Sequence, residues 1–314
     1  MISLGALGGA LEQGLVYAVM ALGVYLTFRV LNFPDLTVDG SFPLGAAAAA
    51  KLICSGVDPV LATAVAPVLG FVAGATTGVL NTKLKISGLL AGILTMTALY
   101  SVNLRVMGRA NIPLLRSATI LTTLRGLGIP GNVAALLLFL SCAVAIKLVL
   151  DAFLRTEFGL ALRATGDNEV MIRSLGVNTD SMKIVGLGLS NALVALSGAM
   201  VAQYQGFADI GMGIGMVVAG LASVIIGGAI FAPTSIGLAT FGAVAGSVVY
   251  RFAVFFALRL GFAPTDLKIV TAALVVVALS GPAIRRASLG MERRRAAGHG
   301  KAEASSKDIL ARNH

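Results

Sequence analysis

The chain has 314 residues, of which 57% are hydrophobic and 12% are charged, and its mean hydropathy is +0.92. This composition excludes an ordinary soluble domain and is typical of a helical protein that crosses a membrane several times. The formal net charge of +10 would suit a nucleic-acid-binding protein, but eight of the 24 Lys and Arg residues lie in residues 285–314. This distribution indicates a basic cytoplasmic flank and no nucleic-acid partner.

Long apolar windows predict the membrane-spanning helices, because each has roughly the 20 residues needed to cross a hydrocarbon core of about 30 Å. They cover residues 4–28, 59–82, 86–104, 133–154, 184–202, 214–231, 235–258 and 267–284. We expect a transmembrane domain over residues 1–284. Residues 285–314 are polar and basic and are expected to form a disordered cytoplasmic tail.

Placing this tail in the cytoplasm orients the loops that precede it. The segments then expected in the cytoplasm or near its face are 231–234, 155–183, Lys83 to Lys85, and Arg29 to Asp39. The segments expected outside are 259–266, 205–213, 105–130, Asp58 and the N-terminus. This assignment requires a further short span at about residues 40–55, and it places Arg105, Arg109, Arg116 and Arg125 outside, against the usual bias. We therefore predict an all-α polytopic fold with 8–10 transmembrane helices.

Two stretches of the chain resemble each other. The first, NFPDLTVDGSFPLGAAAAA, starts at Asn32, and the second, GFADIGMGIGMVVAGLASV, starts at Gly206. Each follows a long span, interrupts it with Gly, Pro or Asp, and restarts as a helix of small residues. The two copies are expected on opposite sides of the membrane, which indicates an inverted internal repeat with broken helices along the transport path. Coincidence is the alternative, because small-residue motifs are common in membrane helices.

Polar side chains inside this apolar chain are candidates for a substrate path. The candidates are Asp35, Asp39, Asn191, Gln203 and Asp209. Charged groups beside a span need water, a partner or a helix N-terminus. Three roles therefore remain open for the aspartates, namely helix capping, lining of the path, and ion coupling. The segment 105–130 combines a polar turn with an amphipathic stretch, and it is either a plain interfacial helix or a contact for an external binding protein.

A charged island, LALRATGDNEVMIRSLGV, interrupts the apolar pattern at residues 160–177. Asp167 is expected to cap a short helix, with Glu169 in the first turn and Gly176 as its stop. Val170, Met171, Ser174 and Leu175 recur at helical spacing and form one face of this helix. The pattern fits both a docking element for a partner and an ordinary solvated loop helix.

Several strings now identify a family resemblance. Residues 156–228, which contain the island, resemble the permease subunits of bacterial ABC importers of the branched-chain amino acid and ribose type. NFPDLTVDGSFPLGA (32–46), GRANIPLL (108–115) and TDLKIVTA (265–272) are similar to the subgroup associated with aromatic amino acid uptake. The resemblance covers about residues 1–284, and it rests on several long strings in the same order.

The resemblance implies that the island holds a coupling helix from Thr165 to Leu175, followed by Gly176. Its polar contacts would come from Asp167, Asn168, Glu169 and Arg173, and its knob from Met171 or Leu175. The implied partners are a second permease copy in a homodimer, two ATP-binding subunits, an external substrate-binding protein and membrane lipid. The implied location is the bacterial inner membrane, where the chain crosses the bilayer several times.

The sequence has no nucleotide site of its own. No G-x-x-x-x-G-K-[ST] string occurs, and the two histidines, His299 and His314, both lie in the tail. We therefore expect no enzyme activity and no cofactor in this subunit, with ATP and Mg²⁺ held by the partner ATPase. The alternative function is an ion-coupled secondary transporter that uses Asp35, Asp39 or Asp209. An integral-membrane enzyme fits less well because no catalytic cluster is present.

Overall fold

A computed structural model describes residues 4–115, 117–126, 131–263, 266, 269–273 and 276. Its helices are α1 (Leu4–Tyr25), the π-helix η1 (Leu26–Val30), α2 (Val38–Cys54), α3 (Pro59–Thr82), α4 (Gly88–Met107), α5 (Ile120–Gly126), α6 (Gly131–Arg155), α7 (Glu157–Asp167), α8 (Glu169–Ser174), α9 (Thr179–Gln205), the 3₁₀-helix η2 (Ile210–Gly213), α10 (Met216–Phe231) and α11 (Ile236–Arg259), and its strands are β1 (Asn111–Pro113) and β2 (Phe207–Asp209). Arg116 and the tail 285–314 lie outside the described residues, as does most of the predicted span 267–284.

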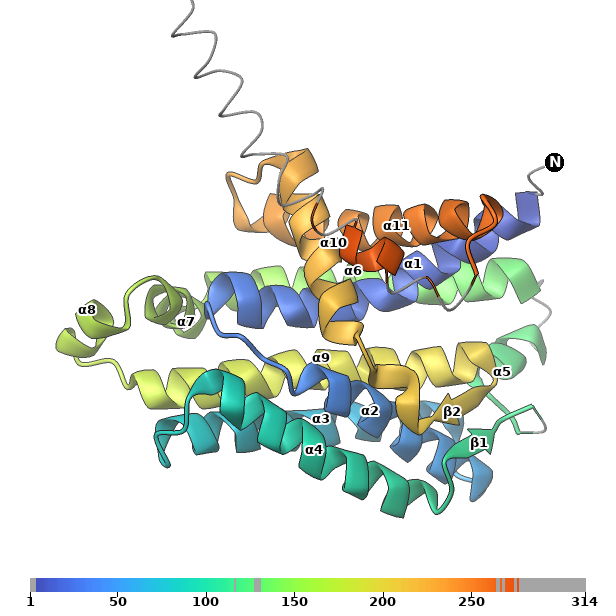
Figure 1. The fold of residues 1–314 in the computed structure, drawn as a ribbon, viewed down its shortest axis with the longest axis horizontal. Coiled ribbons are helices and arrows are strands. Elements are labelled where there is room, and N and C mark those ends of the chain that lie inside the picture. Colours follow the sequence, from blue (N-terminus) through green and yellow to red (C-terminus); the bar gives the residue numbers. More distant parts are fainter. Residues whose placement is uncertain are drawn as a thin grey trace, which may run out of the picture.

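Seven of the described helices are long and apolar enough to cross a membrane, which confirms the all-α polytopic fold. They correspond to the first seven of the eight predicted windows. The additional short span expected at about residues 40–55 is α2, whose 17 residues are fewer than a full crossing requires. The long helices other than α10 lie side by side in one bundle, with α9 in its interior, and α10 runs across them (Figure 1).

Small residues let the backbones in this bundle approach closely. A Cβ atom added at Gly45 of α2 would lie 1.9 Å from the carbonyl oxygen of Ala195 in α9. A Cβ atom added at Gly198 of α9 would lie 2.0 Å from the carbonyl oxygen of Phe42 in α2. Such contacts are typical of membrane helices, which associate through close packing rather than through exclusion of water.

The element order repeats along the chain, as the two similar stretches predict. A long helix, a break, a shorter helix and a second long helix appear as α1, η1, α2 and α3, and again as α9, β2 with η2, α10 and α11. Figure 1 shows that α1 runs in the opposite direction to α9, and α3 in the opposite direction to α11. Moreover, α3 packs on α9 while α11 packs on α1. This exchange of partners is what an inverted-topology repeat requires.

The segments assigned to the outside of the membrane gather at one end of the bundle, on the right in Figure 1. Strand β1 from the segment 105–130 pairs antiparallel with β2 from the segment 205–213, with Ile112 opposite Ala208. The segments assigned to the cytoplasm gather at the other end, where Lys83 lies 3.8 Å from the Asp180 carboxylate. The structure therefore separates the two sets of loops as the sequence predicts.

One part of this assignment is wrong. The stretch Arg29 to Asp39 was expected near the inner face, but beyond Arg29 it turns back into the bundle. Asp35 reaches Asn191, which lies midway along α9. Irregular backbone is tolerated at membrane depth when protein surrounds it, and the backbone N–H of Phe33 donates to the carbonyl of Thr27 at 2.9 Å.

Candidate functional site

The charged island forms two helices rather than one. Helix α7 ends at Asp167, and Asn168 adopts an extended conformation before α8 begins at Glu169. The side-chain oxygen of Asn168 accepts from the backbone N–H of Met171 at 3.0 Å. The N-cap is therefore Asn168, and the expected Asp167 cap and continuous helix from Thr165 to Leu175 are both wrong.

The reason for the break lies in the packing of α7. A Cβ atom added at Gly166 would lie 1.9 Å from the carbonyl oxygen of Val30, so α7 is seated directly on the end of η1. Thr165 is buried beside this contact, and its hydroxyl donates to the carbonyl of Ala161. Because the end of α7 is fixed on the bundle, the chain changes direction at Asn168 and α8 projects beyond it.

A network of polar side chains attaches α8 to the first turns of α9. The Glu169 carboxylate accepts from the Lys183 ammonium at 2.6 Å and from the Arg173 guanidinium at 3.1 Å. Arg173 also donates to the Thr179 hydroxyl at 2.7 Å and to the Asp180 carboxylate at 3.3 Å. The hydrogen bond from Lys183 is the main cause that lowers the pKa of Glu169. Glu169 and Arg173, which were expected to contact a partner, therefore also hold α8 in place.

Three apolar side chains in α8 and at its end point away from the protein, whereas Ile172 is half-buried. Val170 is 81% exposed, Met171 61% and Leu175 66%, and Gly176 ends the segment with a φ of +87°. A cluster of exposed apolar side chains beside charged groups marks an interaction surface more often than chance exposure does. We call Val170, Met171 and Leu175 the α8 knob.

Asp35 holds the residue that precedes α2 and tethers it to α9. One carboxylate oxygen accepts from the backbone N–H of Thr37 at 2.9 Å, and the other accepts from the Asn191 side chain at 2.7 Å. The Thr37 hydroxyl continues this polar contact to Thr77 of α3 at 2.7 Å, and Thr77 donates to Thr95 of α4 at 2.9 Å. The start of α2 is thus joined to three neighbouring helices.

Asp39 connects the N-termini of the two short helices of the repeat. It lies in the first turn of α2, and its carboxylate accepts from the backbone N–H groups of Gly215 at 3.0 Å and Val217 at 2.8 Å. Asp39 also lines a cavity of about 360 Å³, together with Tyr100 of α4 and Ile214. Asp35 lines a smaller cavity of about 100 Å³.

Asp209 repeats the local geometry of Asp35 in the second half of the chain. Its carboxylate accepts from the backbone N–H of Gly211 at 2.8 Å, two residues further on, as Asp35 does from Thr37. Asp209 also accepts from the Asn111 side chain at 3.2 Å. This equivalence is a structural counterpart of the sequence similarity between the two halves.

The remaining two candidates are buried and hydrogen-bonded. Asn191 is fully buried between Asp35 and the carbonyl of Leu187. Gln203 donates to the Thr63 hydroxyl at 2.6 Å and accepts from the backbone N–H of Ile120 at 3.1 Å. Gln203 follows Asn191 by 12 residues in α9, a rise of about 18 Å. The five candidates are therefore spread along the bundle rather than brought into one site.

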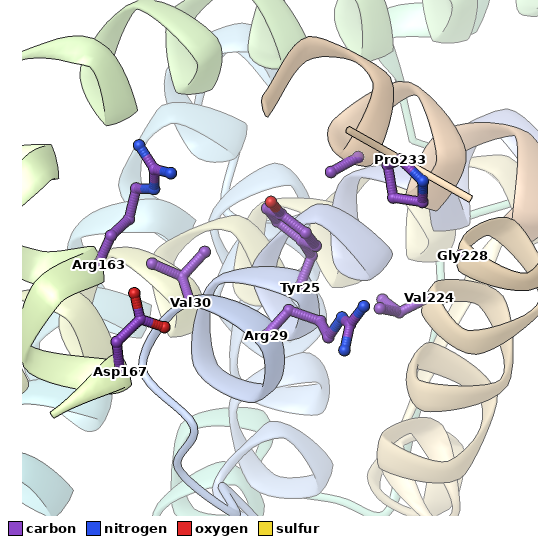
Figure 2. A pocket seen from close by; sticks show the side chains of 9 residues that line it. Tyr25, Arg29, Val30, Arg163, Asp167, Val224, Gly228 and Pro233 are labelled. Atoms are coloured by element: carbon purple, nitrogen blue, oxygen red, sulfur yellow. The ribbon is translucent and has the colours of Figure 1, made fainter. Parts of the chain in front are cut away.

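A further cavity lies at the end of the bundle assigned to the cytoplasm, and the sequence did not indicate it. It has a volume of about 420 Å³, and its polar lining consists of Tyr25, Arg29, Arg163 and Asp167 (Figure 2). These residues come from α1, η1 and α7, and the connection between α10 and α11 closes the other side. No short motif joins them, because each segment contributes one or two side chains.

Comparison with known proteins places this geometry in a wider context. Residues 6–279 match a family described as the permease component of branched-chain amino acid transport systems. The chain is 44% identical to a tyrosine transport system permease protein of Clostridioides difficile over 86% of its own length and 89% of that protein. It is 36% identical to the uncharacterized protein RP368 of Rickettsia prowazekii, over 86% and 95% of the two chains.

More distant similarities extend these matches. The autoinducer 2 import system permease protein LsrC of Escherichia coli is 28% identical over 68% of this chain and 60% of its own length. Among solved structures, PsaBC from Streptococcus pneumoniae in complex with Fab matches with a TM-score of 0.52 at 15% identity, over 86% of this chain and 89% of that one. At this identity the structural match concerns the fold alone.

Proposed function

Since this chain belongs to the family of permease components of branched-chain amino acid transport systems, we propose that it is the membrane-spanning subunit of a binding-protein-dependent, ATP-driven importer of an aromatic amino acid. Its family and the seven apolar helices among its described residues make it a multi-pass protein of the bacterial inner membrane. As a permease component of the ABC type, it carries amino acids or sugars rather than catalysing a reaction.

The observation that carries the proposal is the α8 knob at the cytoplasmic end. Three apolar side chains are held toward water, on a helix that polar contacts attach to α9. Leaving them exposed forgoes the free energy of their burial, which is about 1.5–3 kcal/mol for a large side chain. A cleft on a separate ATP-hydrolysing subunit would recover this free energy, so α8 is our candidate for the coupling helix.

The contacts suggest how force would pass from α8 into the membrane. The Glu169–Lys183 pair joins α8 to the start of α9, and Asn191 of the same helix holds Asp35. A shift of α8 would therefore move α9 along its length and, with it, the re-entrant segment before α2. Asp39 would carry the movement to α10 through its contacts with Gly215 and Val217. Alternating access would follow as one half of the repeat rocks against the other around the broken helices.

The choice of an aromatic amino acid rests on the relatives. The similar protein of Clostridioides difficile is described as a tyrosine transport system permease. The more distant similarity to an autoinducer 2 permease makes a sugar-like solute the competing class. The small-residue helices of this bundle provide few groups for tight recognition, so an external binding protein would select the substrate.

The importer proposed here needs further subunits. A second copy of this chain would complete the path, and two ATP-binding subunits would hold ATP and Mg²⁺ at the cytoplasmic end. The alternative, an ion-coupled secondary transporter, would need a carboxylate free to bind an ion. Asp35, Asp39 and Asp209 instead accept hydrogen bonds from backbone N–H groups, and such contacts satisfy a carboxylate without an ion. These contacts favour the ATP-driven mechanism.

Reconstitution tests the proposal. Proteoliposomes that contain the chain with its co-purified ATPase should accumulate tyrosine when ATP and the external binding protein are supplied. Proteoliposomes that contain the chain alone should accumulate none under a proton or sodium gradient. Accumulation by the chain alone under either gradient would overturn the ATP-driven mechanism. Uptake of a sugar in place of tyrosine would overturn the choice of substrate and leave the mechanism intact.

A further inference from the structure

The cytoplasmic cavity described above concentrates positive charge between separate elements. Arg29 from η1 and Arg163 from α7 line it, with Tyr25 between them (Figure 2). An adjoining cavity of about 480 Å³ shares Tyr25 and Arg163 and adds Arg155 from the end of α6. We call these two cavities, which share part of their lining, the arginine pocket.

Little negative charge balances the arginine pocket. Asp167 is the carboxylate in its lining. Asp151 lies nearby, but its oxygens already contact the Lys147 ammonium and the Thr240 hydroxyl. Within the part of the chain that the structure describes, no ion pair includes Arg29, Arg155 or Arg163. Arg29 and Arg163 thus line the first cavity with one carboxylate, and Arg155 and Arg163 line the second with none among the described residues.

The position of the arginine pocket matches the level of lipid headgroups. Its residues come from the cytoplasmic ends of α1 and α6, from α7, and from the connection between α10 and α11. Each of these segments lies at or just beyond the end of a candidate membrane-spanning helix. Apolar side chains complete the wall, among them Val30, Val224 and Pro233. The arginine pocket could therefore hold an anionic group against its arginines and an attached apolar chain against its apolar wall.

We propose that the arginine pocket binds the phosphate group of an anionic phospholipid from the inner leaflet. A guanidinium group offers paired N–H donors that match phosphate oxygens, and it is more weakly hydrated than an ammonium group. Basic pockets between transmembrane helices on the cytoplasmic side are suited to such headgroups. A lipid bound here would bridge η1 and α7 to the connection between α10 and α11, and so brace the base from which α8 projects.

Native mass spectrometry of the full chain in detergent tests this inference without reference to transport. The purified protein is delipidated and titrated with phosphatidylglycerol or with phosphatidylcholine. The wild type should bind phosphatidylglycerol in preference. Arg29→Gln with Arg163→Gln should weaken that binding about tenfold or more, because both charged guanidinium donors to the phosphate are lost. Arg105→Gln, an exposed arginine at the opposite end, should leave it unchanged.

The other outcomes would overturn the inference. Equal binding of the two lipids, or full binding by the double Gln variant, would exclude the arginine pocket as the site. An equal loss in Arg105→Gln would indicate charge attraction without a site. Tighter binding of inorganic phosphate than of phosphatidylglycerol, titrated on the same delipidated protein, would identify free phosphate as the ligand. Arg29→Lys with Arg163→Lys retains the charge and guards against misfolding, and it should bind more lipid than the Gln variant.

Discussion

The carboxylate of Asp39, in the first turn of α2, accepts a hydrogen bond at 2.8 Å from the backbone N–H of Val217, in the first turn of α10. Because the N-terminus of each helix carries a partial positive charge, the negative charge of this one aspartate stabilises both N-termini. The two short helices belong to opposite halves of the inverted repeat. Their relative position is therefore fixed by this carboxylate.

Removal of this carboxylate should impair transport more than stability alone predicts. Asp39→Ala leaves the N–H groups of Gly215 and Val217 without their acceptor, and loss of such a cap costs about 0.5–2 kcal/mol. Asp58→Ala removes the N-cap of α3, which contacts Val60 and Leu61 at the outer end, and is the matched control. Thermal unfolding in detergent should show a similar loss for both variants, whereas ATP-driven uptake should fall several-fold in Asp39→Ala only. Equal uptake by the two variants would mean that Asp39 is a cap without a role in the path.

The α8 knob should tolerate no charge. Met171→Asp places a carboxylate in a surface that we expect to be desolvated, at a cost of about 1–3 kcal/mol or more without a partner. The variant should reach the membrane but co-purify with about tenfold less ATPase. Leu115→Asp changes a side chain that is 86% exposed at the opposite end, and it should retain the ATPase. Full retention by Met171→Asp would make α8 an ordinary solvated helix.

Glu169 should position the α8 knob through its charge. The hydrogen bond from Lys183 lowers the pKa of Glu169. The stabilisation of α8 by the Glu169 carboxylate is therefore fully present above the usual carboxyl pKa of about 4.3, and it is lost only as the pH falls below that value. The attachment of α8 should therefore not change around neutral pH. Glu169→Gln should speed hydrogen exchange in residues 169–175 with little change in overall stability, because exposed ion pairs contribute about 0–1 kcal/mol. Glu157→Gln, at the start of α7, should leave this exchange unchanged. An equal change in both variants would mean that the contact between Glu169 and Lys183 does not hold α8 in place.

The two ends of the bundle should lie on opposite sides of the membrane. Single cysteines replace Val170 and Leu115, both highly exposed, in a background that lacks Cys54 and Cys142. An impermeant thiol reagent added to spheroplasts should label position 115 and should reach position 170 only after permeabilisation. Labelling of position 170 in intact spheroplasts would reverse the orientation.

The span pattern could be predicted from the sequence because long apolar windows have few alternative structures. The similarity of NFPDLTVDG to GFADIGMGI predicted an internal repeat but left capping, path lining and ion coupling open for its aspartates. The structure shows that Asp35 and Asp209 each accept from the backbone N–H two residues further on. The depth of Asp35 could not be predicted, since a loop between spans looks the same whether it stays at the surface or turns inward. The break at Asn168 depends on the seating of Gly166 against Val30, a contact between distant segments. The arginine pocket was missed for the same reason.

The docking of α8 on an ATP-hydrolysing subunit is most directly tested by cross-linking. A photoreactive amino acid at position 171 is introduced into the full chain in its own bacterial membrane, and the same amino acid at position 115 serves as the control. Irradiation at position 171 should capture a polypeptide that mass spectrometry identifies as carrying a G-x-x-x-x-G-K-[ST] string, and position 115 should not capture it. If position 171 captures only lipid, or if both positions capture the ATPase equally, α8 is not the joint between this permease and its ATPase.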